Sequence, residues 1–483
     1  MLLGLTRGLF SGMGRNMDRL SLYWKNATAA AVGEEHGVSP RELKALAPRI
    51  RELTRQFAEQ RKAKELRYRD LPYDTDMVDA IHTEIEHFRD RCDVLVVLGI
   101  GGSALGNIAL QSALNPPTYN LVSDRVRHGP QVFVLDNVDP DQIKATIELI
   151  APKLRKTIVN VISKSGETAE TAAQFILFRD LLQSRLGAKY RDNILATTDP
   201  RGGTLRELCK AEGYRTLEVP DGVGGRFSVL SAVGLFSAGM CGADIDAILK
   251  GASTMDKCVK EPELEANPAA MIAAINFVLA SKGKPLSVMM SYSSALYYLA
   301  DWYRQLWAES LGKRDGLKKK DLYAGLTPIK ALGTTDQHSQ VQLYREGPND
   351  KLITFLEVER FGNRLAIPSS LKSVPALDYL AGANFQTLIN SEKLATEYAL
   401  LESHRPTMTV LFPQINAETV GQFIYMFETA VSYLGGLLEI NTYDQPAVQL
   451  GKDATYALMG KSGFEALAAK IRPMAARDKK FLI

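Results

Sequence analysis

Three short segments of the chain combine glycine with hydroxyl or charged side chains, each next to a run of apolar residues. The first is Gly99–Gly106, which directly follows the apolar run Val94–Leu98. Glycines such as Gly102 let the backbone approach a ligand, a helix that begins here offers free N–H groups to an anion, and Ser103 adds a hydroxyl. A phosphate ester fits this pattern, but a dinucleotide or a turn without any ligand also fits it.

The second segment, Ser163–Thr168, follows another apolar run, Ile158–Ile162. A helix cap would use one hydroxyl and would leave the other hydroxyls and the cation unexplained. Its candidate phosphate ligands are Ser163, Lys164, Ser165 and Thr168. Two such turns in one sheet predict a single phosphate held from both sides, whereas a dinucleotide-binding domain has no need of the second turn.

The third segment, Asp221–Ser228, places two glycines directly before Arg226. Small neighbours allow a guanidinium to enter a confined site, where it faces a phosphate or an oxyanion that develops during a reaction. The alternative is an arginine that extends to water from a helix end. The glycines favour the functional interpretation.

The elements that position these segments are short apolar strands that alternate with helix-period segments, which is typical of a doubly wound α/β fold. The expected strands are 94–98, 132–135, 158–162, 193–196, 216–219, 286–290, 352–358 and 408–412, and the expected helices include 168–182, 293–311 and 417–438. We therefore predict two parallel-type sheets with a cleft between them. The expected domains are a helical segment over 1–90 that packs on the second lobe, a first domain over 91–254, and a second domain over 255–483 with C-terminal helices.

Composition excludes several classes of protein. The net charge is only +3 from 58 basic and 55 acidic residues, so we expect no nucleic-acid partner. The longest charge-free run, residues 227–243, carries Ser and Gly, and it predicts a buried helix and no membrane span. Four scattered cysteines without close spacing predict free thiols, no metal site and a cytoplasmic protein.

The three segments, in this order, resemble the glucose-6-phosphate isomerase family, whose fold consists of two sugar isomerase domains. The resemblance continues through Trp307–Lys313, Gly333–His338 and Tyr443–Lys452. It implies an aldose–ketose isomerase that needs no cofactor, with a sugar phosphate as substrate and a homodimer as the assembly. Ala447, Val448 and Gln449 stand where the last segment usually has glycine, valine and glutamate, so positions 447 and 449 differ from the pattern, although the spacing from Gln445 to Lys452 is kept.

The resemblance also implies the roles of single residues. Glu309 would be the catalytic base, Arg226 would stabilise the enediolate, and His338 and Lys452 would open the sugar ring, with His338 reaching the neighbouring subunit's site. Gln445 would join the phosphate ligands. The cations at 313–314 and 318–320 could steer an anionic substrate, but such a run is more typical of a solvated loop. Three alternatives stay open: a nicotinamide-dependent oxidoreductase, a dual phosphoglucose and phosphomannose isomerase, and a non-catalytic sugar-phosphate sensor.

Overall fold

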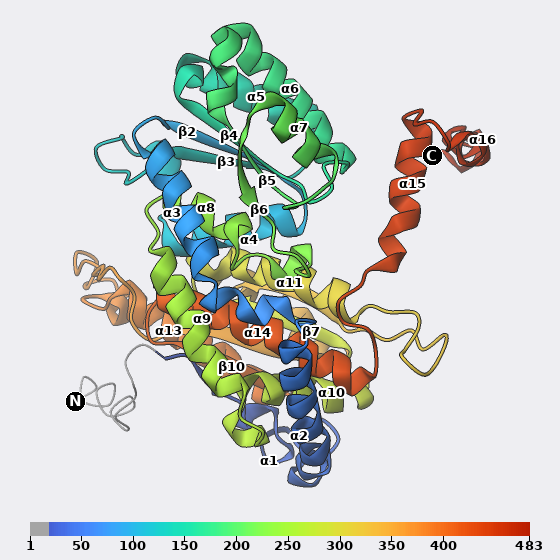
Figure 1. Ribbon diagram of the computed structural model, residues 1–483. Helices are drawn as coiled ribbons and strands as arrows, with labels where there is room; N and C mark the ends of the chain where they lie inside the picture. The colour runs from blue at the N-terminus through green and yellow to red at the C-terminus, as the bar shows by residue number, and fades with distance from the viewer. Residues whose placement is uncertain (1–18) are drawn as a thin grey trace.

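The computed structural model describes residues 19–483, which form two five-stranded sheets surrounded by helices (Figure 1). The strands are β1 (Ser21–Tyr23), β2 (Val94–Leu98), β3 (Gln131–Leu135), β4 (Thr157–Ile162), β5 (Ile194–Thr198), β6 (Arg215–Glu218), β7 (Leu286–Ser291), β8 (Thr327–Leu332), β9 (Lys351–Val358) and β10 (Thr407–Phe412). The α-helices are α1 (Ala29–Val32), α2 (Pro40–Lys62), α3 (Thr75–Arg89), α4 (Gly102–Leu114), α5 (Pro140–Ile150), α6 (Ala169–Leu186), α7 (Thr204–Glu212), α8 (Ala232–Met240), α9 (Ile245–Val259), α10 (Pro268–Ser281), α11 (Tyr297–Leu311), α12 (Val341–Glu346), α13 (Phe385–Leu401), α14 (Ala417–Leu438), α15 (Gln449–Leu458) and α16 (Glu465–Ile471). The predicted α/β class with two parallel-type sheets is confirmed.

The first sheet is wholly parallel, in the order β3-β2-β4-β5-β6. In β2, Leu95 and Val97 join the large central core, while Val94, Val96 and Leu98 face the core under α5 and α6. The strand is therefore buried on both faces, which explains its unbroken apolar sequence. Because β2 and β4 are neighbours and the chain order reverses beside them, the loops that follow these two strands leave the same edge of the sheet side by side.

The second sheet has the order β1-β10-β9-β7-β8, and β1 pairs antiparallel with β10. Two of its strands, both at edges, were not predicted. β1 has three residues, too few for a pattern to show. β8 contains Pro328 and Lys330, which interrupt the apolar run, and an edge strand tolerates a proline because half of its N–H groups have no ladder partner.

A single hydrophobic core links the two sheets. It includes Leu95 of β2 and Leu356 of β9, and it surrounds α14, whose observed bounds equal the predicted ones. The N-terminal segment bridges both halves, because α2 packs on α10 and α14 whereas α3 packs on α8 and β6. Within residues 19–483, no helix is both long and apolar enough to span a membrane.

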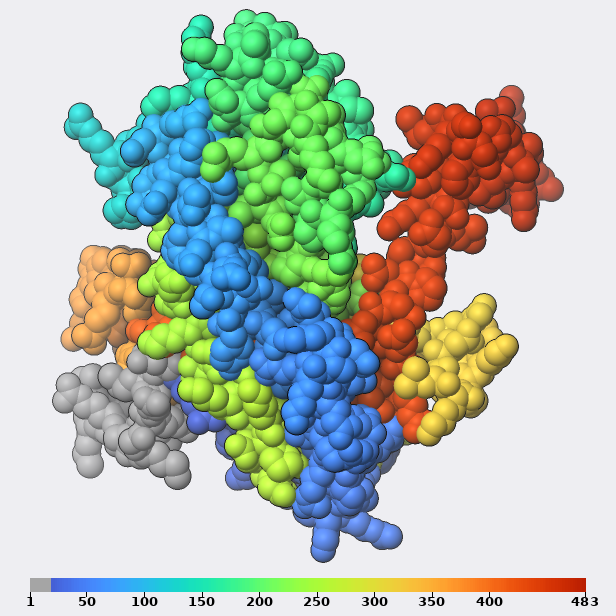
Figure 2. Space-filling view, viewed as in Figure 1, coloured from blue at the N-terminus to red at the C-terminus, as the bar shows by residue number. Residues whose placement is uncertain are grey.

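The C-terminal segment from residue 446 onward stands apart from the body, with α15 and α16 at its end (Figures 1 and 2). Its link to the first half is narrow: the Tyr456 hydroxyl donates to the Glu167 carbonyl at 2.9 Å, and Lys461 lies 3.5 Å from the Glu167 carboxylate. This contact brings α15 beside the loop that follows β4.

Candidate active site

A cleft of about 810 Å³ lies between the loops after β2 and β4, the segment before Arg226, the end of α11 and the start of α15. It collects residues that are hundreds of positions apart in the sequence. Of the predicted site residues, ten line it: Gly102, Ser103, Ser163, Lys164, Ser165, Thr168, Arg226, Glu309, Gln445 and Lys452. The missing one is His338.

Close backbone packing sets the position of the first glycine loop. A Cβ atom on Gly102 would lie 2.1 Å from the carbonyl carbon of Gly225, so a glycine is required where these two loops cross. Gly101, at φ +58°, is the N-cap of α4 and has no side chain to cap the helix. Gly102 and Ser103 line the cleft, where the Gly102 N–H and the Ser103 hydroxyl are available to a ligand, whereas the N–H groups of Ser103 and Ala104 donate to the carbonyls of Ile100 and Gly101.

The second loop shapes itself with its own hydroxyls. The Ser163 hydroxyl accepts a hydrogen bond from the Gly166 N–H at 3.0 Å, and the Ser165 hydroxyl accepts one from the Glu167 N–H at 3.1 Å. Thr168 is the N-cap of α6, yet its side chain makes no capping hydrogen bond. Its hydroxyl is half-buried in the cleft lining and remains available to a ligand, as does the exposed Lys164.

Arg226 is 2% exposed and joins the two halves of the chain. Its Nε donates to Ser310 Oγ at 2.8 Å, and its Nη2 donates to the carbonyls of Thr442 and Asp444 at 2.7 and 3.1 Å. Its Nη1 donates to Gln445 Oε1 and, at 3.4 Å, to Glu309 Oε2. Burial lowers the pKa of Arg226, and the Glu309 carboxylate opposes that shift.

Glu309 lies in the last turn of α11, where its side chain is 32% exposed and lines the cleft. Each carboxylate oxygen has one donor: Gln305 Nε2 at 3.0 Å on Oε1, and Arg226 Nη1 on Oε2. Two donors on opposite oxygens fix the plane of the carboxylate. An oriented carboxylate in a cleft is suited to accept a proton from a bound carbon acid.

His338 lies away from this cleft, at the end of the short helix η9 (Thr335–Gln337), and it is exposed. Lys452 lies in the first turn of α15 and is also exposed, at the side of the cleft formed by the C-terminal segment. Gln449, the residue that departs from the family pattern, donates from Nε2 to Asp453 at 2.8 Å on its own helix. It does not line the cleft.

Several residues of the site were missed or misjudged from sequence. Gln305 and Ser310 were not predicted. Gln305 lies one helical turn before Glu309, so helix spacing is the signal that would have found it, whereas Ser310 directly follows Glu309 and contacts Arg226. Lys313 was interpreted as part of a solvated loop, and this was wrong. It is 7% exposed, donates to the Glu309 carbonyl at 2.7 Å and pairs with Asp444 at 3.2 Å.

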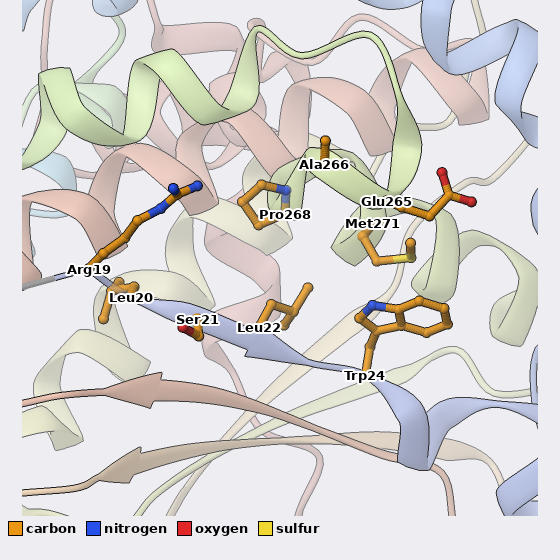
Figure 3. A pocket seen from close by; sticks show the side chains of 9 residues that line it. All are labelled: Arg19, Leu20, Ser21, Leu22, Trp24, Glu265, Ala266, Pro268 and Met271. Carbon is orange, nitrogen blue, oxygen red and sulfur yellow. The ribbon is translucent and has the colours of Figure 1, made fainter. Parts of the chain in front are cut away.

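Another hollow, about 310 Å³, lies between β1 and the start of α10 (Figure 3). Its lining has one base, Arg19, and one acid, Glu265, with apolar and small residues between them. The Arg19 guanidinium donates to Cys258 Sγ at 2.9 Å. This hollow has no group of facing polar side chains comparable to that of the cleft. In the described chain, no cluster of three or more His, Cys, Asp or Glu side chains has a geometry that suits a metal ion.

Comparison with known proteins gives a consistent result. The model of the phosphoglucose isomerase family matches residues 86–465. A glucose-6-phosphate isomerase of Carboxydothermus hydrogenoformans is 45% identical over 408 residues, covering 84% of this chain and 88% of the relative. A second, from Rubrobacter xylanophilus, is 41% identical over 437 residues, covering 89% and 97%.

Solved structures agree on the fold. A hypothetical protein of Thermus thermophilus superposes with a TM-score of 0.81 at 34% identity, covering 92% of this chain and 100% of that one. A glucose-6-phosphate isomerase of Chlamydia trachomatis has the same fold, with a TM-score of 0.69 at 24% identity, covering 87% and 78%. The matched region includes every residue that lines the cleft, and the chain belongs to the phosphoglucose isomerase family.

Proposed function

We propose that this protein is an enzyme that interconverts glucose 6-phosphate and fructose 6-phosphate by acid–base catalysis. The observation that carries the proposal is the Glu309 carboxylate, held between Gln305 and Arg226 opposite two loops rich in hydroxyl and N–H donors. Such an arrangement places a base and an anchor for a phosphate in one cleft. Family membership supports the same reaction.

The reaction moves the carbon-bound proton of C2 to C1, and the hydroxyl proton of O2 moves to O1. Glu309 accepts the proton from C2 of the open-chain aldose and returns it to C1, and the intermediate between these steps is an enediolate. Negative charge then develops on the substrate oxygens near Glu309. Arg226 holds a fixed positive charge at 3.4 Å from that carboxylate, so it stabilises the enediolate without having to move.

The phosphate is the anchor that brings C1 and C2 to the base. We assign its binding to Gly102, Ser103, Ser163, Lys164, Ser165, Thr168 and Gln445. Binding energy gained at a group that does not react orients the reacting carbons, which is worth several orders of magnitude in rate. Two strand–loop–helix turns at the switch point of one sheet support this assignment.

Opening of the sugar ring requires an acid and a base near the ring oxygen, and we assign this work to His338 and Lys452. Lys452 lines the cleft, whereas His338 is exposed elsewhere on the same chain. We therefore propose a homodimer in which each subunit supplies His338 to the other's cleft. Exposed apolar side chains on α12, which begins three residues after His338, and on α13, which α12 contacts, support the proposal. They are Leu343, Phe385, Leu394 and Tyr398.

We infer a cytoplasmic location from the state of the cysteines. Cys92, Cys209, Cys241 and Cys258 are all buried free thiols, which supports a reducing environment and hence the cytoplasm.

The test is a coupled dehydrogenase assay on the purified protein after EDTA treatment, with fructose 6-phosphate as substrate. Rapid formation of glucose 6-phosphate is the expected result. Absence of turnover, with fructose 6-phosphate still binding in calorimetry, would instead identify a sugar-phosphate sensor. A parallel assay with mannose 6-phosphate distinguishes the dual isomerase, and a titration with NAD tests the oxidoreductase.

A further inference from the structure

A third cavity, of about 480 Å³, has five cationic residues among the eight that line it. It lies between the C-terminal part of α2, the short helix η2 (Arg67–Tyr73) and the residue that follows α9. Its charged lining consists of Arg61, Lys62, Lys64, Arg69, Lys260 and a single carboxylate, Asp70. It shares no lining residue with the active-site cleft.

Nearby carboxylates do not neutralise this set. Asp256, which is fully buried behind the cavity, already accepts hydrogen bonds from the hydroxyls of Tyr73 and Tyr425 at 2.7 and 2.6 Å. Burial favours a raised pKa for Asp256, but hydrogen bonds from Lys260 and the two tyrosines lower it below its ordinary value, so it is ionised. Five cations thus face two carboxylates, and within the described chain Lys62 has no ion pair.

Arg69 is the second, independent sign of a ligand. It is 4% exposed, yet its Nε and Nη2 make no hydrogen bond to any described residue. Its ion pair with Asp256 is long, at 3.7 Å. Buried guanidinium donors are nearly always satisfied, and their preferred acceptors are the oxygens of carboxylate and phosphate groups.

We propose that this cavity binds a small phosphorylated anion at a site separate from the active site. Its volume suits a ligand of metabolite size and is far too small for a protein or nucleic-acid partner. Arg69 lines the cavity but its unpaired Nε and Nη2 are buried, so it would have to reorient to offer its planar fork, and the exposed Lys62 and Lys64 would supply mobile charges at the rim. A ligand with two or more negative charges matches the excess of cations.

The cavity adjoins η2, which also packs against segments of the active site. Its occupant is therefore placed to regulate the isomerase, an inference that rests on the proposed function. Tyr68, next to Arg69 on η2, packs its ring on Phe227 at 4.8 Å, and Phe227 follows Arg226. The hydroxyls of Tyr68 and Tyr443 both form hydrogen bonds with Ser432 Oγ, and Tyr443 lies two residues before Gln445. An anion that reorients Arg69 therefore acts on η2, which supports the segments that hold Arg226 and Gln445.

Calorimetry with pyrophosphate and, separately, inorganic phosphate tests the site on the full chain. We expect two binding sites per chain for pyrophosphate. The double substitution Lys62→Gln with Lys64→Gln should weaken one of them roughly tenfold, since each rim charge contributes modestly. Lys319→Gln with Lys320→Gln removes the same charge from an exposed loop and should weaken neither. Arg69→Lys, which keeps the charge but loses the fork, should weaken the same site if the variant folds.

A single site that Ser163→Ala with Thr168→Ala abolishes, and that Lys62→Gln with Lys64→Gln leaves intact, would overturn the proposal. Regulation has its own readout. With both proteins measured at saturating fructose 6-phosphate, pyrophosphate should change kcat in the native protein and not in the variant with Lys62→Gln and Lys64→Gln. Saturating substrate displaces pyrophosphate from the active site only, so an effect on kcat that remains must come from the separate site. Binding without any change in kcat would overturn the regulatory part. A protein that binds pyrophosphate at this site but does not turn over fructose 6-phosphate would leave the site standing and refute the proposed isomerase activity.

Discussion

The two walls of the active-site cleft are built in different ways. The phosphate wall consists of Gly99–Gly106 and Ser163–Thr168, each of which directly follows a strand of the first sheet. The catalytic wall consists of Arg226, Glu309 and Lys452, which come from separate segments. The side-chain hydrogen bonds of Arg226 connect its own segment to the segments that carry Glu309 and Gln445.

This difference teaches where the precision of the site comes from. The phosphate wall is local: backbone N–H groups and hydroxyls within a few residues of a strand end shape it, as the Ser163–Gly166 bond shows. The catalytic wall depends on the packing of distant elements, and its proposed histidine lies outside the cleft of its own chain. Changes in the first wall should therefore affect substrate binding, whereas changes in the second should affect turnover.

The largest effect is expected for Glu309→Gln. The amide keeps the shape and can still contact Arg226, but it cannot accept the C2 proton. We expect kcat to fall by about 10²–10⁴-fold with little change in KM. Steady-state kinetics on fructose 6-phosphate measure it, and Glu402→Gln, an exposed helix-end carboxylate outside the cleft, is the matched control. Native turnover in Glu309→Gln would show that the catalytic wall contains a different base.

The second prediction tests whether the catalytic wall is shared between subunits. His338→Ala and Glu309→Gln proteins should each be almost inactive alone. After mixing and exchange of subunits, half of the dimers are hybrids, and each hybrid has one intact site if His338 serves the partner. The activity of the mixture, measured by the coupled assay, should then recover to about a quarter of the native value.

The control for that experiment is a mixture of Glu309→Gln with Lys452→Ala. If Lys452 serves its own chain, one site of each hybrid lacks the base and the other lacks the lysine, so that neither site is intact. No recovery is expected. Recovery in the control together with none for His338→Ala would reverse the assignment of the two residues.

The third prediction concerns the phosphate wall. Ser163→Ala with Thr168→Ala removes two hydroxyls from a site that retains its backbone donors, so KM for fructose 6-phosphate should rise about tenfold. The kcat value should change much less, because the base is on the other wall. Ser184→Ala, at the far end of α6, removes a hydroxyl outside the cleft and should change neither constant. A fall in kcat alone would break the division between the two walls.

The phosphate wall was predictable from sequence for the same reason that it is local. Val94–Leu98 was predicted to its observed bounds, and the loops that follow are defined by residue types at fixed offsets from the strand. The long helix Ala417–Leu438 was also predicted to its observed bounds, because a largely apolar run of that length is too long for a strand and is typical of a buried helix. The edge strands β1 and β8 carried no comparable pattern, since only pairing with a neighbour makes them strands.

The catalytic wall was predictable only in part. Glu309, His338 and Lys452 were identified through family resemblance, because a single carboxylate or histidine has no local pattern that separates it from an exposed residue. Lys313 shows the limit most clearly. Its neighbours are charged and the sequence indicates a solvated loop, but Asp444, more than a hundred residues away, pairs with it and buries it. Such pairing depends on tertiary structure and leaves no trace in local sequence.

The last prediction concerns the support behind the catalytic wall. Glu428 of α14 is fully buried, and neither of its carboxyl oxygens has a hydrogen-bond partner among the described residues. Burial raises the pKa of Glu428 well above its ordinary value. The folded protein therefore keeps a proton that the unfolded chain releases above about pH 4.5. Between that value and the folded-state pKa, unfolding releases the proton of Glu428. The free energy of unfolding therefore falls as pH rises through this range.

Glu428→Gln should remove this contribution, because an amide resembles the protonated acid and does not titrate. Relative to the native protein, we expect an unchanged Tm at about pH 4 and a Tm higher by about 2 °C at about pH 8, since ~1 kcal/mol moves Tm by a few degrees. Calorimetric scans at both pH values measure it, with Glu402→Gln as the exposed control that should show no such difference. An equal Tm at the higher pH would mean that Glu428 ionises in the folded state, and that the packing of α14 behind Tyr443 and Ser432 admits a buried charge.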